Sequence, residues 1–507
     1  MDVRSIEPIA FALECHQKGQ LDEAERMYGE LLARNPEDAD ALHLLGMLLH
    51  DTGRFESALG CIARAIELRP DTPYYHSNLG NVLQRLQRFG DAELCYRQAL
   101  RLDPRLAEAS NNLGNALAAL DRMPEAIQSF LDAIQRRPEY HEAYANLGHL
   151  LLERGMCVEA LGCYREASRL APEYQPYRAS VAIALGKCGE AHARGHNHEA
   201  AIQSYLAALD LAPDEPSLHL GLGNSLLAMG RLESGWREAE WRWRIGDYPN
   251  LSFSQPVWDG QPLAGSRILL WAEQGHGDTI QYVRFAEAVK RAGGFVLIEC
   301  QPRLERLLSS CPWLDEVIPF GAPLPDFDIH APLQSLGRIL RTSLANIPAN
   351  IPYLSAEPEL IDARKAGESG ACRVGIAWSG NPENRYDADR SLTTGHFADL
   401  KSIPGVNWFS LQKEDVPGDF ADAAALVASL DLVISVDTAA AHLAGALGKP
   451  VWTLLPFAAD SRWLLDRDDS QWYPTMRLFR QDSPGDWDSV LARVRLELER
   501  FRDERRG

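Results

Sequence analysis

A proline recurs through the first half of the chain at a fixed interval of 34 residues, and this spacing limits the fold more than any other feature. The prolines of the series are Pro36, Pro70, Pro104, Pro138 and Pro172. Leu-Gly pairs and alanines keep the same interval, and each alanine is followed four residues later by a bulky residue, as Ala92 is by Tyr96. Small residues let two helices cross closely, and proline ends the second helix. The period therefore predicts stacked helical pairs.

This pattern resembles the tetratricopeptide repeat. The next proline of the series, Pro213, comes 41 residues after Pro172, which indicates an insertion of about seven residues in one unit. About seven units over residues 1–245 predict a right-handed solenoid with a concave groove. Solenoids of this class bind extended peptides, so we expect a polypeptide partner, with a homodimer as the alternative use of the repeats. The tryptophans near the last unit (Trp236, Trp241, Trp243) predict a packing cap.

Asparagines recur just before successive Leu-Gly pairs, at Asn78, Asn112 and Asn146. Because residues three apart share a helix face, these and the asparagines after the glycines are placed to form a ladder that hydrogen-bonds a peptide backbone. The arrangement resembles the asparagine ladder of the O-GlcNAc transferase repeat domain, and the resemblance implies that the ladder binds the acceptor. Hydrogen bonds between neighbouring repeats are the alternative interpretation.

Charge and composition exclude several classes of protein. The 507 residues carry a formal net charge of −20, which argues against nucleic acid or anionic lipid as a general partner. No apolar run approaches the length of a membrane span, and the N-terminal segment lacks the pattern of a signal peptide. The nine cysteines show no zinc-ligand spacing. We therefore expect reduced thiols, no stable membrane insertion and a cytoplasmic location.

From Arg267 onward, short apolar strands alternate with glycine turns and amphipathic helices. This alternation predicts two parallel sheets covered by helices, that is, two Rossmann-like units with a cleft between them. We place a linker at 246–262, the first unit at 263–365, the second at 366–482 and a closing helix at 483–507. The chain contains no G-x-G-x-x-G or Walker A sequence, so neither unit is a dinucleotide-binding or P-loop domain by motif.

One strand-to-helix turn is built to receive an anion. An apolar strand over 432–436 ends at Asp437, and Thr438, Ala439 and Ala440 open a helix in which His442 follows. Small side chains let a phosphate approach free backbone N–H groups at a helix N-terminus, with Thr438 and His442 as further donors. In the alternative interpretation Asp437 caps the helix and the alanines pack against the sheet.

The run Ser435-Val436-Asp437-Thr438, followed by His442-Leu443, resembles glycosyltransferases of the GT-B fold, notably the heptosyltransferase family. The resemblance covers about 265–480 and implies an α-solenoid followed by an α/β GT-B fold whose second unit binds the nucleotide part of the donor. That family's lysine near the first donor loop is absent here, so Arg385, Arg390 or Lys413 must serve the phosphate. The further donor-binding residues that the resemblance implies are Trp378, Gly380, Asn381, Ser391 and Gln412.

The catalytic candidates lie in the first turn of the first sheet. Gly277-Asp278 matches the Gly-Asp of the heptosyltransferases, and the resemblance implies Asp278 as the general base. His276, in the same loop, is the alternative base, while Asp278 with Gln281 also fits a helix-capping pair. His330 follows a predicted strand and either lines the acceptor side or is a hydrogen-bonded structural histidine.

GT-B enzymes act without an obligatory metal, and residues 387–389 (Asp-Ala-Asp) fit an ion-paired loop better than a metal site, so we expect neither metal nor cofactor, only a nucleotide-sugar co-substrate. The sequence thus predicts a transferase that moves a sugar to Ser or Thr of a protein held by the repeats. It is similar to bacterial repeat-fused transferases that modify flagellin. The alternatives are a transferase acting on lipopolysaccharide or another glycan, and a repeat adaptor with an inactive GT-B half.

Overall fold

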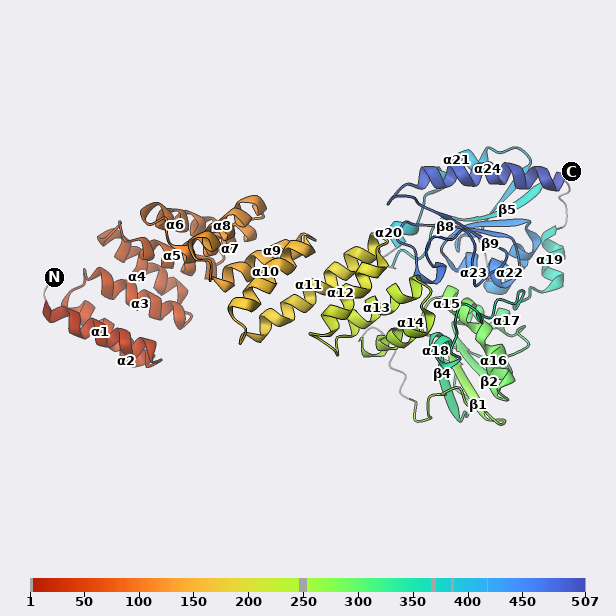
Figure 1. Ribbon diagram of the computed structural model, residues 1–507, viewed down its shortest axis with the longest axis horizontal. Helices are drawn as coiled ribbons and strands as arrows, with labels where there is room; N and C mark the ends of the chain where they lie inside the picture. The colour runs from red at the N-terminus through yellow and green to blue at the C-terminus, as the bar shows by residue number, and fades with distance from the viewer. Residues whose placement is uncertain (1–2, 246–252, 366–370, 384–386, 417, 507) are drawn as a thin grey trace. The chain divides into compact units, whose positions relative to one another are not determined.

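The computed structural model describes residues 3–245, 253–365, 371–383, 387–416 and 418–506 (Figure 1). The chain divides into two compact units, residues 1–188 and 189–507. The first unit is helical, and the second contains the last helical pairs together with both sheets.

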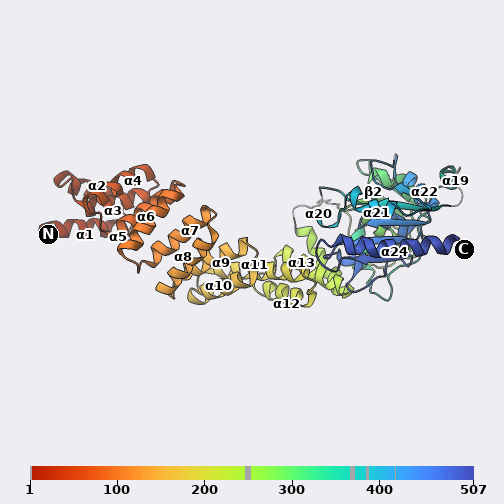
Figure 2. The same ribbon diagram turned by 90° about the horizontal axis from the view of Figure 1, so that it is seen from above.

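Consecutive helices of the first unit form helical pairs, which Figure 2 shows following one another along the unit. Within the described residues its helices are α1 (Val3–Gln17), α2 (Leu21–Arg34), α3 (Ala39–Asp51), α4 (Phe55–Leu68), α5 (Pro73–Arg85), α6 (Phe89–Leu102), α7 (Ala107–Ala119), α8 (Met123–Arg136), α9 (His141–Glu153), α10 (Cys157–Leu170) and most of α11 (Gln175–Arg194). The predicted stacked pairs of a tetratricopeptide-type solenoid are confirmed.

The repeating small and bulky residues pack as the period predicts. A Cβ on Gly80 would lie 2.6 Å from the ring of Tyr96, and one on Gly114 would lie 2.7 Å from the ring of Phe130. The glycines therefore let each first helix rest directly on the aromatic ring of the second, and both rings are fully buried.

The second unit begins with the end of the helical series: α12 (His198–Leu209), α13 (Pro216–Ala228), α14 (Leu232–Ala239) and the 3₁₀ turn η1 (Glu240–Arg244). The predicted insertion of about seven residues lies in α11, which has 20 residues where the corresponding helix α9 has 13. The predicted packing cap holds for two tryptophans. Trp236 is buried in the core of the second unit, and Trp243 lies 5.3 Å from Trp271, whereas Trp241 stacks on His219 within the last repeat.

Both sheets are parallel, which confirms the predicted α/β region. The first has the order β3-β2-β1-β4 and the second the order β6-β5-β7-β8-β9. The strands of the first sheet are β1 (Arg267–Trp271), β2 (Phe295–Cys300), β3 (Glu316–Pro319) and β4 (Ile329–Pro332). Those of the second are β5 (Cys372–Ala377), β6 (Val406–Ser410), β7 (Leu432–Val436), β8 (Val451–Leu455) and β9 (Met476–Arg480).

Short helices join the strands. They are α15 (His276–Tyr282), η2 (Val283–Phe285), α16 (Ala286–Arg291), η3 (Pro302–Leu304), α17 (Glu305–Leu308), η4 (Leu333–Ser335), α18 (Leu336–Ile339), α19 (Pro358–Lys365), α20 (Asp387–Arg390), η5 (Thr394–Phe397), α21 (Ala398–Lys401), α22 (Phe420–Ser429), α23 (Ala439–Ala446) and η6 (Ser461–Trp463). The final helix α24 (Trp487–Arg506) lies along the second sheet in Figure 1 and packs against it through Val490 and Val494. Among the described residues, no helix has both the length and the apolar character that a membrane crossing requires.

One apolar core joins the last helical pair to both sheets. It includes Leu227 and Trp236 of that pair, Ile268 of β1 and Val433 of β7. The strands are apolar on both faces because helices cover both, as is usual for parallel sheets. The loops at the carboxyl ends of β1 and β7 are thereby held on a rigid support.

Candidate functional site

The turns that follow β1 and β7 touch each other. A Cβ on Gly277 would lie 2.9 Å from Cδ2 of His442 and 3.4 Å from Cα of Ala439. The absence of a side chain at Gly277 therefore allows the first turns of α15 and α23 to meet. Helix N-termini at the carboxyl ends of parallel strands carry free backbone N–H groups and favour anions. Two such ends lie together here, one from each sheet.

Arg462 of η6 connects the two turns. Its guanidinium donates to Oδ1 of Asp278 at 2.8 Å, to Oε1 of Gln281 at 2.7 Å and to Oδ1 of Asp460 at 2.9 Å. Burial alone would lower the pKa of Arg462, but the carboxylates of Asp460 and Asp278 outweigh it and hold the pKa well above its usual value. Asp278 and Gln281 thus share one cation, and the helix-capping interpretation of this pair is wrong, because the N-cap of α15 is Gly275 without a side-chain bond.

Asp437 is a buried carboxylate behind the second turn. Its Oδ2 accepts a hydrogen bond from Nε1 of Trp463 at 2.8 Å, and its backbone oxygen accepts one from Arg390 at 2.8 Å. Burial raises the pKa of Asp437. The interpretation of Asp437 as the helix cap is wrong, since the N-cap of α23 is Thr438, which makes no side-chain capping bond.

His442 is engaged inside the protein at both ring nitrogens. Nδ1 lies 2.9 Å from the hydroxyl of Tyr473, and Nε2 lies 3.3 Å from a guanidinium nitrogen of Arg462. Burial, and then the charge of Arg462, lower its pKa well below the usual value, so the ring is neutral, and Nε2 accepts from the guanidinium. We expected His442 to donate a hydrogen bond to a bound ligand. Its side chain is only 2% exposed and interacts with Arg462 and Tyr473 instead.

The loop after β5 is braced by the residues expected at the donor side. Gln412 accepts from the backbone N–H of Trp378 at 3.1 Å, and Ser391 accepts from that of Gly380 at 2.9 Å. Arg390 donates to Oδ1 of Asp387 at 3.1 Å, which agrees with the expected ion pair, although residues 387–389 belong to the short helix α20 and not to a loop. Within the described part of the chain, no cluster of His, Cys, Asp and Glu has the arrangement of a metal site.

Three further donor-side residues stand apart from this network. Asn381 is exposed and accepts from the backbone N–H of Glu383 at 3.2 Å, as in a turn. Lys413 is exposed at the loop after β6. Arg385 lies outside the described residues.

His276 lies at the entrance of the first turn. Its ring stacks on Phe420 of α22, with the ring centres 5.0 Å apart. Burial lowers the pKa of His276, and the nearby charges of Arg303 and Lys413 lower it further. The imidazole is therefore neutral at pH 7 and has the protonation state that a base requires.

His330 is a structural histidine. It lies inside β4, not after it, and is 6% exposed. Its Nδ1 accepts from Nε1 of Trp271 at 3.2 Å, and its ring packs on Phe253. The expectation that it lines the acceptor side is wrong, because the strand begins at Ile329 and turns the ring into the core.

The predicted asparagine ladder is a chain of hydrogen bonds between repeats. The amide nitrogens of its members each reach the preceding repeat: Asn78 to Nε2 of His43 at 2.8 Å, Asn112 to Asn81 at 2.9 Å and Asn146 to Asn111 at 2.9 Å. The alternative interpretation, bonding between neighbouring repeats, is thus confirmed. Binding of an acceptor by this ladder remains a prediction.

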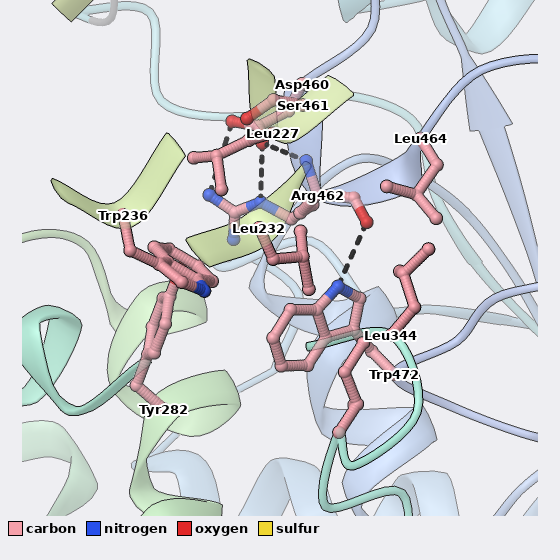
Figure 3. A pocket seen from close by; sticks show the side chains of 11 residues that line it. Leu227, Leu232, Trp236, Tyr282, Leu344, Asp460, Ser461, Arg462, Leu464 and Trp472 are labelled. Atoms are coloured by element: carbon pink, nitrogen blue, oxygen red, sulfur yellow. Dashed lines mark hydrogen bonds and ion pairs between the residues drawn. The ribbon is translucent and has the colours of Figure 1, made fainter. Parts of the chain in front are cut away.

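A cavity borders Arg462 on the side of the last helical pair (Figure 3). Leu227, Leu232 and Trp236 line it from that pair, opposite Arg462 and Trp472.

Sequence reasoning missed Arg284, a buried arginine that supports the site from behind. It donates to the backbone oxygen of Trp472 at 2.5 Å and to the hydroxyl of Tyr353 at 2.9 Å. The only available signal was an arginine within the apolar stretch at 279–289.

Comparison with known families agrees with both halves of this description. Tetratricopeptide-repeat models match residues 16–81, 77–141 and 189–230. The model of glycosyltransferase family 9 (heptosyltransferase) matches residues 417–462, which include Asp437, the start of α23 and Arg462. The chain therefore combines tetratricopeptide repeats with a segment, residues 417–462, that is similar to glycosyltransferase family 9.

Individual relatives are more distant. Protein FlbA of Caulobacter vibrioides is 26% identical over 366 residues, which cover 63% of this chain and 60% of the relative, so the chain matches less than two thirds of that protein. The crystal structure of YrrB, described as a TPR protein with an unusual peptide-binding site, is 22% identical with a TM-score of 0.32, covering 38% of this chain and 95% of YrrB. A TPR protein of Thermus thermophilus, TTC0263, is 24% identical with a TM-score of 0.32, covering 36% and 98%.

Proposed function

We propose that this protein is a GT-B glycosyltransferase that moves a sugar from a nucleotide-activated donor to a Ser or Thr hydroxyl of a polypeptide bound by its repeats. Flagellin is the first acceptor to test. The observation that carries the proposal is the contact between the two strand-to-helix turns, in which Gly277 meets Ala439 within the segment that matches glycosyltransferase family 9. A nucleotide diphosphate and an acceptor hydroxyl would meet between these turns.

The donor phosphates bind at the N-terminus of α23. Thr438, Ala439 and Ala440 offer backbone N–H groups there, and no side chain caps the helix. Arg390 and Lys413 add positive charge, with Arg385 as a further candidate. The nucleotide lies against the loop after β5. Gln412 and Ser391 hold the backbone of this loop in place. A metal ion is not required, because fixed dipoles and cations neutralise the phosphate.

The transfer needs a base that takes the proton of the acceptor hydroxyl. The hydroxyl oxygen then bonds to the anomeric carbon, and the bond to the donor phosphate breaks with its electron pair going to the phosphate oxygen. Asp278 is our first candidate for the base, since it lies at the contact of the turns and Arg462 keeps its carboxylate in place. His276 is the alternative, because its imidazole is neutral and half-buried.

Nucleotide binding tests the donor site first. The melting temperature of the full chain is measured with UDP, GDP, ADP and CMP, for the wild type and for Lys413→Ala and Arg390→Ala. A ligand that binds only the folded state raises the melting temperature. We expect a shift with one nucleotide that shrinks in both variants and stays in Lys290→Ala, a control on the other sheet that pairs with Asp315. Absence of a shift with every nucleotide would contradict the proposal and favour the repeat adaptor.

Donor hydrolysis or transfer then separates the two bases. We expect Asp278→Asn to lower kcat by about 10²- to 10⁴-fold, the usual contribution of a general base, with nucleotide binding retained. His276→Gln should lower kcat by less than about tenfold if the base is Asp278. If His276 is the base, His276→Gln should show the large loss of kcat and Asp278→Asn the small one. In that case the rate of the wild type falls with acid only below the usual histidine range, because burial lowers the pKa of His276.

A further inference from the structure

A hollow that carries three arginines lies between the last repeat and the first sheet. It has a volume of about 200 Å³ and lies between α14 and α18, which contact each other and are neighbours in Figure 1. We call it the arginine hollow. Its lining residues are Glu233, Trp236, Arg237, Gly337, Arg338 and Arg341.

The arginine hollow is positive although the chain as a whole has a net charge of −20. Glu233 is the one carboxylate among its lining residues, and it lies 4.0 Å from Arg237. Arg338 lies 3.3 Å from Glu240, which also pairs with Arg242 at 2.9 Å. Three guanidinium groups therefore face few carboxylates, and an anion can satisfy them.

Arg341 is the least committed of the three. It is exposed, and its guanidinium has no hydrogen-bond or ion-pair partner among the residues that the structure describes. It follows the end of α18 with a φ of 52°, where the N–H of Thr342 bonds back to the oxygen of Gly337. Glycine is the usual residue at this helix-ending position. The chain instead accepts a backbone cost of about 1 kcal/mol or more and places a long cation at the hollow.

Trp236 links the arginine hollow to the candidate site. Its ring rests on Gly337, where a Cβ would lie 2.9 Å from the indole. The same tryptophan lines the cavity beside Arg462 (Figure 3). Arg462 in turn is the residue that binds Asp278. Nε1 of Trp236 is buried and has no hydrogen-bond partner among the described residues. A chain segment in the arginine hollow would thus lie one indole ring away from the cavity that leads to Arg462.

We propose that the arginine hollow binds acidic side chains of the polypeptide acceptor, near the residue that is modified. The planar guanidinium fork of arginine fits a carboxylate with two parallel hydrogen bonds. The hollow adjoins a helical pair of the tetratricopeptide type, a class that binds polypeptides, which favours a peptide carboxylate over a free anion. The inference rests on the proposed function, since it assigns an acceptor subsite to the same enzyme.

Peptide binding tests the inference without any sugar transfer. Two fluorescein-labelled peptides are compared on the full chain by fluorescence anisotropy: one with a central Ser between Asp and Glu residues, and one with Asn and Gln in their place. We expect the acidic peptide to bind at least about tenfold more tightly at low salt, and this preference to fall as salt screens the charges. The double variant Arg237→Glu/Arg341→Glu should abolish the preference.

A matched control reverses two exposed arginines elsewhere, Arg105→Glu and Arg291→Glu, whose side chains are 91% and 73% exposed. This control should keep the preference, and Arg341→Lys should keep part of it. Equal binding of both peptides to the wild type overturns the inference. So does a preference that the control loses to the same extent. Competition by inorganic phosphate without any preference for the acidic peptide would also overturn it, since the hollow would then be a phosphate site.

The failure of the proposed function looks different. If the double variant loses the acidic preference while no nucleotide binds the wild type, the hollow stands as a polypeptide site and the glycosyltransferase proposal fails. If a nucleotide binds and the donor is turned over, but the peptides are not distinguished, the enzyme stands and the hollow is overturned. The melting temperature of the double variant without any ligand shows whether it is folded in both cases.

Discussion

The repeats at 3–188 and the unit at 189–507 differ in how far apart in the sequence their bonded side chains lie. In the repeats, side chains on different helices bond about one repeat apart, as Arg54 does to Glu25, 29 residues away, and Asn146 to Asn111, 35 residues away. In the second unit, Arg462 reaches Asp278 across 184 residues, and Arg284 reaches Trp472 across 188. Because each repeat bonds mainly to its neighbours, we expect a change in one repeat to destabilise only the repeats next to it. The long-range bonds of the second unit tie its elements together, so we expect them to lose stability as one cooperative body.

The largest test of this contrast is Arg462→Met. The substitution leaves Asp278 and Asp460 without their cation. Their side chains are 19% and 43% exposed, so we expect a cost of about 2–4 kcal/mol, toward the lower end of what breaking a fully buried pair costs. Hydrogen exchange of the full chain should show faster exchange in both sheets and unchanged protection from α3 to α8. Arg467→Met is the control, since its pair with Asp469 is partly exposed and worth about 1 kcal/mol or less. Equal losses in the two variants would contradict a collective role for Arg462.

The two units should also differ in their response to pH. Burial raises the pKa of Glu273 to about 7 from an ordinary 4.5, although Arg242 pulls it down. The folded state therefore holds this proton more tightly, and the free energy of unfolding falls by about 3 kcal/mol as pH rises from 4.5 to 7. In the repeats, bonding to Arg54 lowers the pKa of Glu25, so the stability from that group is lost as pH falls.

Denaturation of wild type and Glu273→Gln at pH 5 and pH 8 measures this effect. At pH 5 the side chain of Glu273 is mostly protonated, so glutamine replaces it without removing a negative charge from Arg242. At pH 8 the variant avoids the cost of ionising a buried carboxyl, so its free energy of unfolding should change less between pH 5 and pH 8 than that of the wild type. An identical change in both proteins would show that Glu273 keeps an ordinary pKa in the folded state.

A smaller and more confined effect is expected from Gly114→Ala. The added carbon would lie 2.7 Å from the ring of Phe130, and overpacking of this kind costs about 1–3 kcal/mol. Exchange should accelerate in α7, α8 and their neighbours, but not in the sheets. Gly60→Ala is the matched control, because its Cβ meets nothing within 4 Å, and alanine favours a helix. Loss of protection throughout the chain would mean that the repeats unfold as one body.

The smallest effect is expected from Asn112→Ala, which removes one bond to Asn81 and the acceptor of Asn111. We expect a loss of about 0.5–1.5 kcal/mol, measured as exchange in α5 and α7. Asn115→Ala, on the same helix, should cost less. If peptide binding falls in Asn112→Ala while stability does not, the ladder serves the acceptor as well as the repeats.

The same contrast explains what sequence reasoning could reach. A fixed period determines its own contacts, so the pairing of Gly80 with Tyr96 follows from spacing alone. Apolar runs likewise located the strands, and small residues located the turn at Thr438. The ion pair of Arg462 with Asp278 has no such rule, because its partners are 184 residues apart. Asp437 follows its strand as predicted, and only the alternative that it caps the next helix was wrong, by one residue. His330 was placed after a strand that in fact contains it, which turns its side chain from a loop into the core.

Gly277 gives the molecule a built-in gauge of the separation between its two sheets. Because the backbone of Gly277 meets the ring of His442 and the backbone of Ala439, each carbon atom added at this position would push the two turns further apart. The substitutions Gly277→Ala, Gly277→Ser and Gly277→Val would increase the separation of the two strand-to-helix turns in steps. Turnover plotted against spacer size would then report how closely donor and acceptor must approach.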